Sequence, residues 1–274
     1  MDNKNQSSIN LPSAIIIAGA IIAIAIIYVK KPVTNTIIPN DNQQISNKIN
    51  LEPVTAKDHI LGNPNAPIKI VEYSDPSCPY CKTFNSTMNQ IMDKYGPSGK
   101  VAWVYRSIPL DTPDANGNVL HPNARNESQA IECAGILGGN EKFWAYQKIL
   151  YETTPSVTSQ TPQGLDQKQL PIFAKNIGLD VISFNECLNS ENAKKLVQAQ
   201  TISGINAGVS GTPTRFFVLA KSINPTAITY LNNALLQYRI PADLLYVGDD
   251  KKTIAMSGAM PVAMVTGIIE SLLK

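Results

Sequence analysis

The stretch IKIVEYSDPSCPYCKTF, residues 68–84, decides the fold of this chain. Its first half is an apolar run with the length and β-branched character of a buried strand. Its second half begins a helix, because apolar residues continue at close to a 3.6-residue period through Phe84, Met88, Ile91, Met92 and Tyr95. The pattern therefore predicts a strand that leads directly into a helix, and the glycines and proline of residues 96–99 predict where that helix ends.

Two cysteines, Cys78 and Cys81, lie at this junction with the spacing C-x-x-C. One helical turn holds both sulfur atoms close enough to bond, and Pro79 suits the first helical position, where no N–H is needed. The helix N-terminus places free N–H groups and a partial positive charge beside Cys78, which favours its thiolate. An exposed thiolate of low pKa, with a second thiol one turn away, is suited to disulfide exchange. We therefore expect Cys78 to be the attacking thiol and Cys81 the resolving thiol.

A C-x-x-C pair can also be half of a zinc site or a plain structural disulfide. Zinc needs two further ligands, but the chain has no second C-x-x-C and no paired-histidine motif, and its two histidines are His59 and His121. We therefore favour redox chemistry and expect neither a metal nor a cofactor. The formal net charge of +2, with 16% charged residues and no basic run, gives no reason to expect nucleic-acid binding.

A second segment, GVSGTPTRFFV at residues 208–218, places a glycine-flanked Thr212-Pro213 before a short apolar strand. With GNPNAP at residues 62–67 and EYSD at residues 72–75, these motifs make the chain resemble the DsbA-like thiol:disulfide oxidoreductases of the thioredoxin superfamily. The likeness runs from about residue 58 to 218 and resumes from about 253 to the C-terminus. It implies an α/β thioredoxin fold, with a central mixed sheet flanked by helices and an inserted all-helical domain, and protein thiol–disulfide oxidoreductase activity.

The resemblance also implies roles in binding substrate. Pro213 looks like the superfamily's cis-proline, although an ordinary trans-proline turn is the alternative. Because Pro213 has no N–H, the backbone of Thr212 would be available to pair with an extended substrate, as in β-augmentation. Pro79 and Tyr80, between the two cysteines, are expected to contact that substrate as well. Arg215 departs from the family pattern, in which an apolar residue is commoner.

Glu72 lies six residues before Cys78 and matches the position of a buried acid beneath the second cysteine. Burial would raise its pKa and let it take the proton of Cys81. The alternative is a solvent-exposed carboxylate at a strand edge. Oxidising members of the family often carry a histidine next to the second cysteine, and Tyr80 supplies no such cation. The predicted oxidase therefore has two alternatives: a reductase or isomerase, and a non-catalytic peptide-binding chaperone with the same fold.

The predicted helical insertion covers residues 123–190, with candidate helices over 123–137, 141–151 and 166–177, followed by a further helix over 191–207. It contains the other two cysteines, Cys133 and Cys187. These could be free buried thiols, but exported relatives can pair such positions, so the resemblance favours a structural disulfide. Four cysteines are an even set, as in proteins of oxidising compartments. We expect His121 in a loop or capping role and Phe143 and Trp144 in the core.

The end of the chain departs from the family, in which a tight turn joins two closing strands. Here an extra insertion of about residues 221–252 intervenes, with an amphipathic helix predicted over 226–238. The closing strand is expected at 253–256 and the last helix at 264–273. The insertion should leave the sheet at the end away from the cysteines. It is either an extension without a function or, as a hypothesis, a docking surface.

The N-terminal region has a short tail at residues 1–10, an apolar segment at 11–29 and a polar, flexible linker at 30–50, before the domain at 51–274. About 19 apolar residues can span a bilayer, which predicts an uncleaved transmembrane anchor. A cleaved signal peptide is the alternative, but no small-x-small site precedes Lys30 and Lys31.

The charges around this segment and the resemblance indicate opposite orientations. Lys4 precedes the segment while Lys30 and Lys31 follow it, which by the positive-inside rule would leave the domain in the cytoplasm. Large domains translocate largely regardless of such charges, and the family implies export. We therefore expect a single-pass protein of the cell membrane with its catalytic domain on the extracytoplasmic side. Thiol-containing exported proteins would be its substrates, and the resemblance implies reoxidation by a quinone-linked membrane oxidoreductase.

Overall fold

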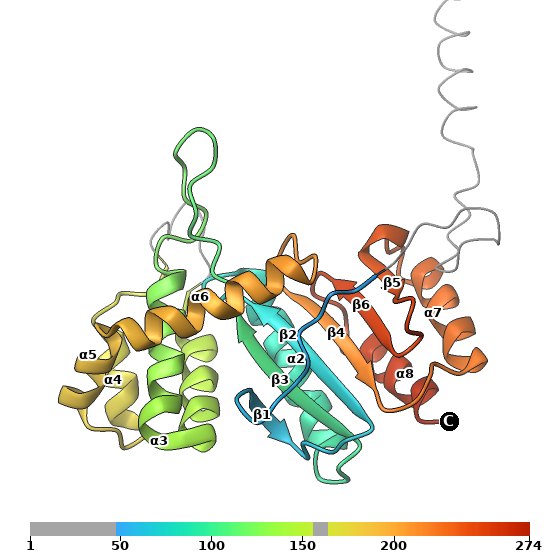
Figure 1. Ribbon diagram of the computed structural model, residues 1–274, viewed down its shortest axis with the longest axis horizontal. Coiled ribbons are helices and arrows are strands. Elements are labelled where there is room, and N and C mark those ends of the chain that lie inside the picture. The colour runs from blue at the N-terminus through green and yellow to red at the C-terminus, as the bar shows by residue number, and fades with distance from the viewer. Residues whose placement is uncertain (1–47, 156–163) are drawn as a thin grey trace, which may run out of the picture. The chain divides into compact units, whose positions relative to one another are not determined.

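The computed structural model describes residues 48–155 and 164–274 (Figure 1). The predicted tail, the predicted anchor at residues 11–29 and residues 30–47 of the predicted linker lie outside this range. Within it, every helix is too short or too polar for a membrane span.

The centre of the fold is a six-stranded mixed sheet with the strand order β1-β3-β2-β4-β6-β5. Its strands are β1 (His59–Gly62), β2 (Ile68–Ser74), β3 (Val101–Ser107), β4 (Thr214–Leu219), β5 (Leu245–Val247) and β6 (Thr253–Ser257). β2 and β3 run parallel, and the other neighbours run antiparallel. The expected α/β fold with a mixed sheet is thus confirmed, and both edge strands, β1 and β5, are additions to what the sequence predicted.

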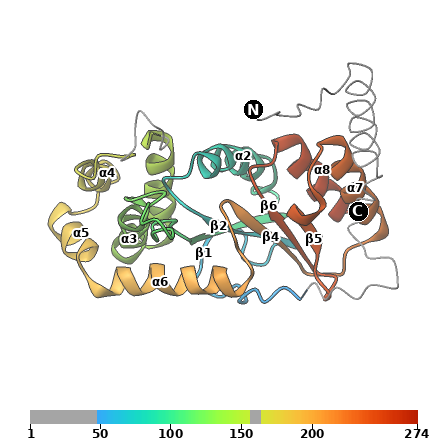
Figure 2. The ribbon, with the colours of Figure 1, turned by 90° about the horizontal axis from the view of Figure 1, so that it is seen from above.

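Helices cover both faces of the sheet (Figure 2). On one face lie α2 (Pro79–Tyr95) and α8 (Val262–Leu272), and on the other lies α6 (Glu191–Asn206). Along β2 the side chains alternate between these layers, so that Ile70 joins the core beneath α2 and Val71 joins the core beneath α6. Burial on both faces explains why this strand is apolar at successive positions.

The helical insertion consists of α3 (Ala124–Thr153), α4 (Gln169–Asn176) and α5 (Val181–Leu188). The predicted helices over 123–137 and 141–151 are the two halves of α3, which is interrupted at Gly139 with φ 69° and ψ −169°. A positive φ of this kind is accessible to glycine at little cost. Phe143 and Trp144 are both buried.

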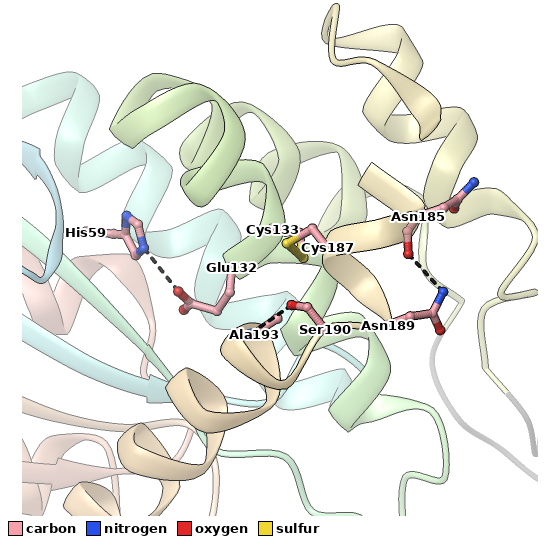
Figure 3. The surroundings of a disulfide bond; sticks show 8 residues. All are labelled: His59, Glu132, Cys133, Asn185, Cys187, Asn189, Ser190 and Ala193. Atoms are coloured by element: carbon pink, nitrogen blue, oxygen red, sulfur yellow. Dashed lines mark hydrogen bonds and ion pairs between the residues drawn. A yellow bond between two sulfur atoms is a disulfide. The ribbon is translucent and has the colours of Figure 1, made fainter. Parts of the chain in front are cut away.

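A disulfide between Cys133 and Cys187 joins α3 to α5, with an S–S distance of 2.08 Å and a sequence separation of 54 (Figure 3). Cys133 is fully buried, and both cysteines pack in the apolar core. Beside this disulfide, Nε2 of His59 and Oε2 of Glu132 lie within hydrogen-bonding distance, 3.2 Å apart (Figure 3).

The C-terminal insertion forms part of the core. After β4 the chain continues into α7 (Pro225–Gln237), which packs against α8 through buried residues such as Leu231 and Leu235. A 3-10 turn, η1 (Ala242–Leu244), then leads into β5, which pairs with β6. The insertion leaves the sheet at the far end of β4, as predicted. Its last part, β5, returns to the sheet near the start of β4, because Leu245 pairs with Met256, which in turn pairs with Arg215.

Candidate active site

The cysteine pair lies where β2 ends and α2 begins. Cys78 is the N-cap of α2 with extended backbone angles, Pro79 is the first helical residue, and Cys81 lies within the first turn. Both cysteines are free thiols. Tyr80 between them is 66% exposed, whereas Cys78 is only 4% exposed. The expectation of an exposed attacking thiol is therefore wrong for this state of the protein.

The segment that covers Cys78 comes from far along the chain. The Thr212–Pro213 peptide bond is cis, and the carbonyl oxygen of Thr212 lies 3.6 Å from the Sγ of Cys78. These residues reach the cysteines because β4 pairs antiparallel with β2, with Thr214 opposite Tyr73. The sheet thus brings together the two segments that the sequence analysis singled out.

The two thiols have opposite pKa shifts. The pKa of Cys78 is lowered to about 6, first by a hydrogen bond from the Cys81 thiol and further by the Thr212 side chain and by the backbone N–H groups of Cys81 and Tyr80, while burial opposes this. Burial raises the pKa of Cys81, and the neighbouring Cys78 raises it further. Near neutral pH, Cys78 is therefore a thiolate and Cys81 holds its proton.

Glu72 is 1% exposed on the central strand β2, so the alternative of a solvent-exposed carboxylate at a strand edge is wrong. The indole Nε1 of Trp103 donates a hydrogen bond to its Oε2 at 2.9 Å. Burial raises the pKa of Glu72 to about 7, although Ser74, Arg215 and Trp103 act in the opposite direction. Glu72 makes no direct hydrogen bond to Cys81, because its Oε2 is bonded to Trp103 and its Oε1 has no partner.

A second buried carboxylate, Asp75, connects the cysteines to a loop that follows β3. Its Oδ2 accepts a hydrogen bond from the N–H of Leu110 at 2.7 Å and contacts Nδ1 of His121 at 2.8 Å. Its own N–H donates to the Sγ of Cys81 at 3.4 Å. Burial lowers the pKa of His121, but the hydrogen bond and charge of Asp75 outweigh this and raise it overall.

A third carboxyl group, that of Glu127 on α3, accepts a hydrogen bond from the hydroxyl of Ser77 at 2.7 Å. Burial raises its pKa to about 7. The sequence analysis missed Asp75 and Glu127 and gave His121 only a loop or capping role. Asp75 had a local signal, since it precedes Cys78 by three residues. His121 and Glu127 had none, because the tertiary fold alone brings them to the site.

Comparison with known proteins agrees with this fold. Residues 54–230 match the sequence model of a family described as Thioredoxin. The crystal structure of Wolbachia pipientis alpha-DsbA1 superposes with a TM-score of 0.59 at 22% identity, covering 82% of this chain and 96% of that one. Oxidised BdbD of Bacillus subtilis gives a TM-score of 0.53 at 21% identity, covering 63% of this chain and 87% of that one. At these identities the similarity establishes the fold.

Two relatives found by sequence carry different names. A Rickettsia felis protein, whose name assigns it to the protein-disulfide oxidoreductases, is 26% identical over 186 residues, which is 66% of this chain and 61% of that protein. A Na(+)/H(+) antiporter, NhaA 3 of Salinispora tropica, is 27% identical over 180 residues, which is 66% of this chain but 24% of the antiporter. This chain thus spans about a quarter of the length of the antiporters it matches, and their transport activity is not assigned to it.

Proposed function

This chain belongs to the thioredoxin family, and we propose that it is a DsbA-like thiol–disulfide oxidoreductase whose redox pair is Cys78 and Cys81. The observation that carries the proposal is the opposite perturbation of the two thiols, with the pKa of Cys78 lowered to about 6 and that of Cys81 raised. Near neutral pH the reduced pair holds one thiolate and one thiol. Oxidation of a substrate produces this reduced state, and reduction of a substrate disulfide starts from it.

In the oxidising direction, a substrate thiolate attacks the Sγ of Cys78 in the Cys78–Cys81 disulfide. The bond between the two cysteines breaks, Cys81 leaves with the electron pair and takes up a proton, and a mixed disulfide joins Cys78 to the substrate. A second substrate thiolate then attacks the substrate sulfur, so that a substrate disulfide forms and Cys78 leaves as a thiolate. Two electrons pass from the substrate to the cysteine pair.

The pKa of Cys78 supports net oxidation of substrates. A stabilised thiolate favours the reduced pair and so makes the disulfide a stronger oxidant. We therefore propose that the pair oxidises its substrates, with disulfide reduction or isomerisation as the alternative direction.

Substrate binding is proposed along the cis-proline segment. An extended peptide would pair with the backbone of Thr212 beside Pro213, and Pro79 and the exposed ring of Tyr80 would contact it from the other side. Glu72 is proposed to exchange a proton with Cys81 through a bridging water, because no direct hydrogen bond joins them.

The cellular setting is also part of the proposal. The apolar segment at residues 11–29 supports a single-pass membrane anchor, and the resemblance supports an extracytoplasmic catalytic domain that acts on thiol-containing exported proteins. Reoxidation by a quinone-linked membrane oxidoreductase would complete the cycle.

The test is single-turnover oxidation of a peptide with two thiols by the pre-oxidised full chain, followed by mass spectrometry. We expect a peptide disulfide to form. When the peptide instead carries a disulfide, we expect the Cys78 thiolate of Cys81→Ala to attack it and to accumulate as a mixed disulfide, because no resolving thiol is present. Cys78→Ser should abolish both products. Peptide binding by Cys78→Ser and wild type alike, with no exchange by either, would contradict the proposal and favour the peptide-binding chaperone.

A further inference from the structure

The register of the sheet places a buried cation opposite a buried acid. β2 and β4 pair with Glu72 opposite Arg215, and the same row continues to Tyr105 on β3 and Met256 on β6. Directly opposite residues of an antiparallel pair project from the same face. For Glu72 and Arg215 this is the face covered by α2, which carries the cysteines.

Arg215 is fully buried, with 0% of its surface exposed, yet it makes few polar contacts. Its guanidinium carbon lies 4.0 Å from the centre of the Phe84 ring on α2, and its Nη2 donates to the carbonyl oxygen of Gly258. Its Nε and Nη1 have no hydrogen-bond partner, and neither has Oε1 of Glu72. Arg215 and Glu72 therefore do not form a direct ion pair.

Such an arrangement is a poor source of stability. A buried charge without a full set of hydrogen bonds carries a large desolvation cost, and well-packed apolar residues in its place are often neutral or stabilising. Packing therefore does not account for an arginine at this position, and its charge needs another explanation.

The groups that face Glu72 and Arg215 come from several further positions. They are Ser74 on β2, Cys81 on α2, Trp103 and Tyr105 on β3, and Tyr151 on α3. These groups are hydroxyl, thiol, phenol or indole, and the carboxylate of Asp75 acts on the set through Cys81 and Tyr105. Arg215 is the cation of this set, and it interacts electrostatically with both Glu72 and Cys81.

We propose that Arg215 is a positioning residue for thiol–disulfide exchange, whose charge favours the ionised forms of Glu72 and Cys81. The inference rests on the proposed function. When a substrate thiolate attacks Cys78, the electron pair of the broken disulfide goes to the Sγ of Cys81. The carboxylic acid of Glu72 then supplies a proton to that thiolate, and the Glu72 carboxylate that remains faces Arg215. In the reverse direction the carboxylate takes the proton back.

The positive charge of Arg215 favours the carboxylate form of Glu72. Burial raises the pKa of Glu72 to about 7, and Arg215 acts against this rise. Without the cation the pKa of Glu72 would increase further, and the carboxylate needed to deprotonate Cys81 would form only at higher pH. Arg215 thus keeps the proton exchange within the neutral range.

The test compares Arg215→Met, which removes the charge, with Arg215→Lys, which keeps it. The pH profile of single-turnover reduction of a peptide disulfide by the reduced full chain is measured for both. We expect the step near pH 7 to move up by about one unit or more in Arg215→Met and to stay within a few tenths of a unit of wild type in Arg215→Lys. Thermal unfolding should show that Arg215→Met is as stable as wild type or more so. If it does not fold, Arg215→Gln replaces it with the same expectation.

A Glu72→Gln background shows whether the charge acts through Glu72. There the step near pH 7 should be absent, and adding Arg215→Met should cause no further shift. The inference would be overturned if the pH profile of Arg215→Met superimposed on that of wild type. It would also be overturned if Arg215→Met shifted the profile equally in the Glu72→Gln background. If wild type exchanges no disulfide at any pH, the proposed function itself fails. An active wild type whose pH profile is unchanged by Arg215→Met would instead contradict only the role of Arg215.

Discussion

The protein contains two cysteine pairs in contrasting surroundings. Cys78 and Cys81 lie at the start of a helix, three residues apart and reduced, whereas Cys133 and Cys187 lie 54 residues apart and are joined. Each pair has a histidine–carboxylate pair nearby. His121 and Asp75 are close to the reduced pair, and His59 and Glu132 lie beside the disulfide (Figure 3).

The difference lies in what the sulfur atoms can interact with. Cys78 has helix N–H groups, a neighbouring thiol and the Thr212 side chain, all of which stabilise a thiolate. Cys133 lies in an apolar core between helices. A cysteine is therefore reactive or structural according to the donors and charges around it. Changing the neighbours of one pair should alter the properties of that pair and leave those of the other pair unaffected.

The largest expected effect is a difference in peptide oxidation rate between variants of the two cysteine pairs. Cys78→Ser should reduce peptide oxidation by several orders of magnitude, to the background rate, because the Cys78–Cys81 disulfide that the substrate thiolate attacks cannot form. Cys133→Ser at the other pair should leave the rate close to wild type when assayed well below its unfolding temperature. The measurement is the single-turnover rate, and equal losses in both variants would remove the distinction.

The second prediction concerns stability. Replacing both Cys133 and Cys187 by alanine opens a loop of 54 residues, for which the chain-entropy model gives a loss of about 4 kcal/mol. Urea unfolding of the oxidised protein measures this loss. The reduction potential of the Cys78–Cys81 pair should stay within experimental error of wild type, and a large change would mean that the two pairs are coupled.

A third prediction uses the buried acid Glu127, which accepts a hydrogen bond from Ser77, the residue before Cys78. Its pKa is raised from 4.5 to about 7, so the unfolded chain binds fewer protons between these values and stability falls as pH rises through them. Glu127→Gln should remove its part of this decline, up to about 3 kcal/mol. Unfolding of the oxidised protein, in which the cysteines do not titrate, measures the effect.

Glu141→Gln is the matched control for this substitution. Glu141 lies on the same helix and its side chain is 88% exposed, so Glu141→Gln removes a carboxylate from this helix without removing a buried one. If stability depended less on pH in both variants to the same extent, burial of Glu127 would be ruled out as the cause.

The smallest expected effect comes from the histidines. The His121 cation and the Cys78 thiolate favour each other, so His121→Asn should raise the pKa of Cys78 by less than one unit and weaken the oxidant less than tenfold. The pH dependence of Cys78 alkylation measures this. His59→Asn, beside the other pair, should leave it unchanged, and a shift of the same size would mean that the effect is not local.

The sequence predicted the parts of the site that are continuous in the chain. The strand–helix junction carries Cys78 and Cys81, and the motif around Pro213 was recognisable at a distance because its glycines and apolar strand are local features. Arg215 was recognised only as unusual, since its burial opposite Glu72 depends on the register of β2 and β4.

What sequence reasoning missed depends on tertiary contacts. β1 and β5 are four and three residues long, too short for a periodic pattern, and they form because each pairs with a longer neighbour. His121 reaches Asp75 only because the loop after β3 folds back onto the end of β2. The contact of the Cys78 Sγ with the Thr212 carbonyl likewise joins residues that are far apart in the sequence.

The most direct test of the account is a redox titration of the full chain in glutathione buffers, with differential alkylation and mass spectrometry of all four cysteines in one sample. The account predicts that Cys78 and Cys81 become reduced between about −120 and −270 mV. Cys133 and Cys187 should stay joined throughout this range, since structural disulfides have potentials below about −300 mV. Reduction of both pairs together, or a Cys78–Cys81 disulfide that resists reduction as strongly as the other, would contradict it.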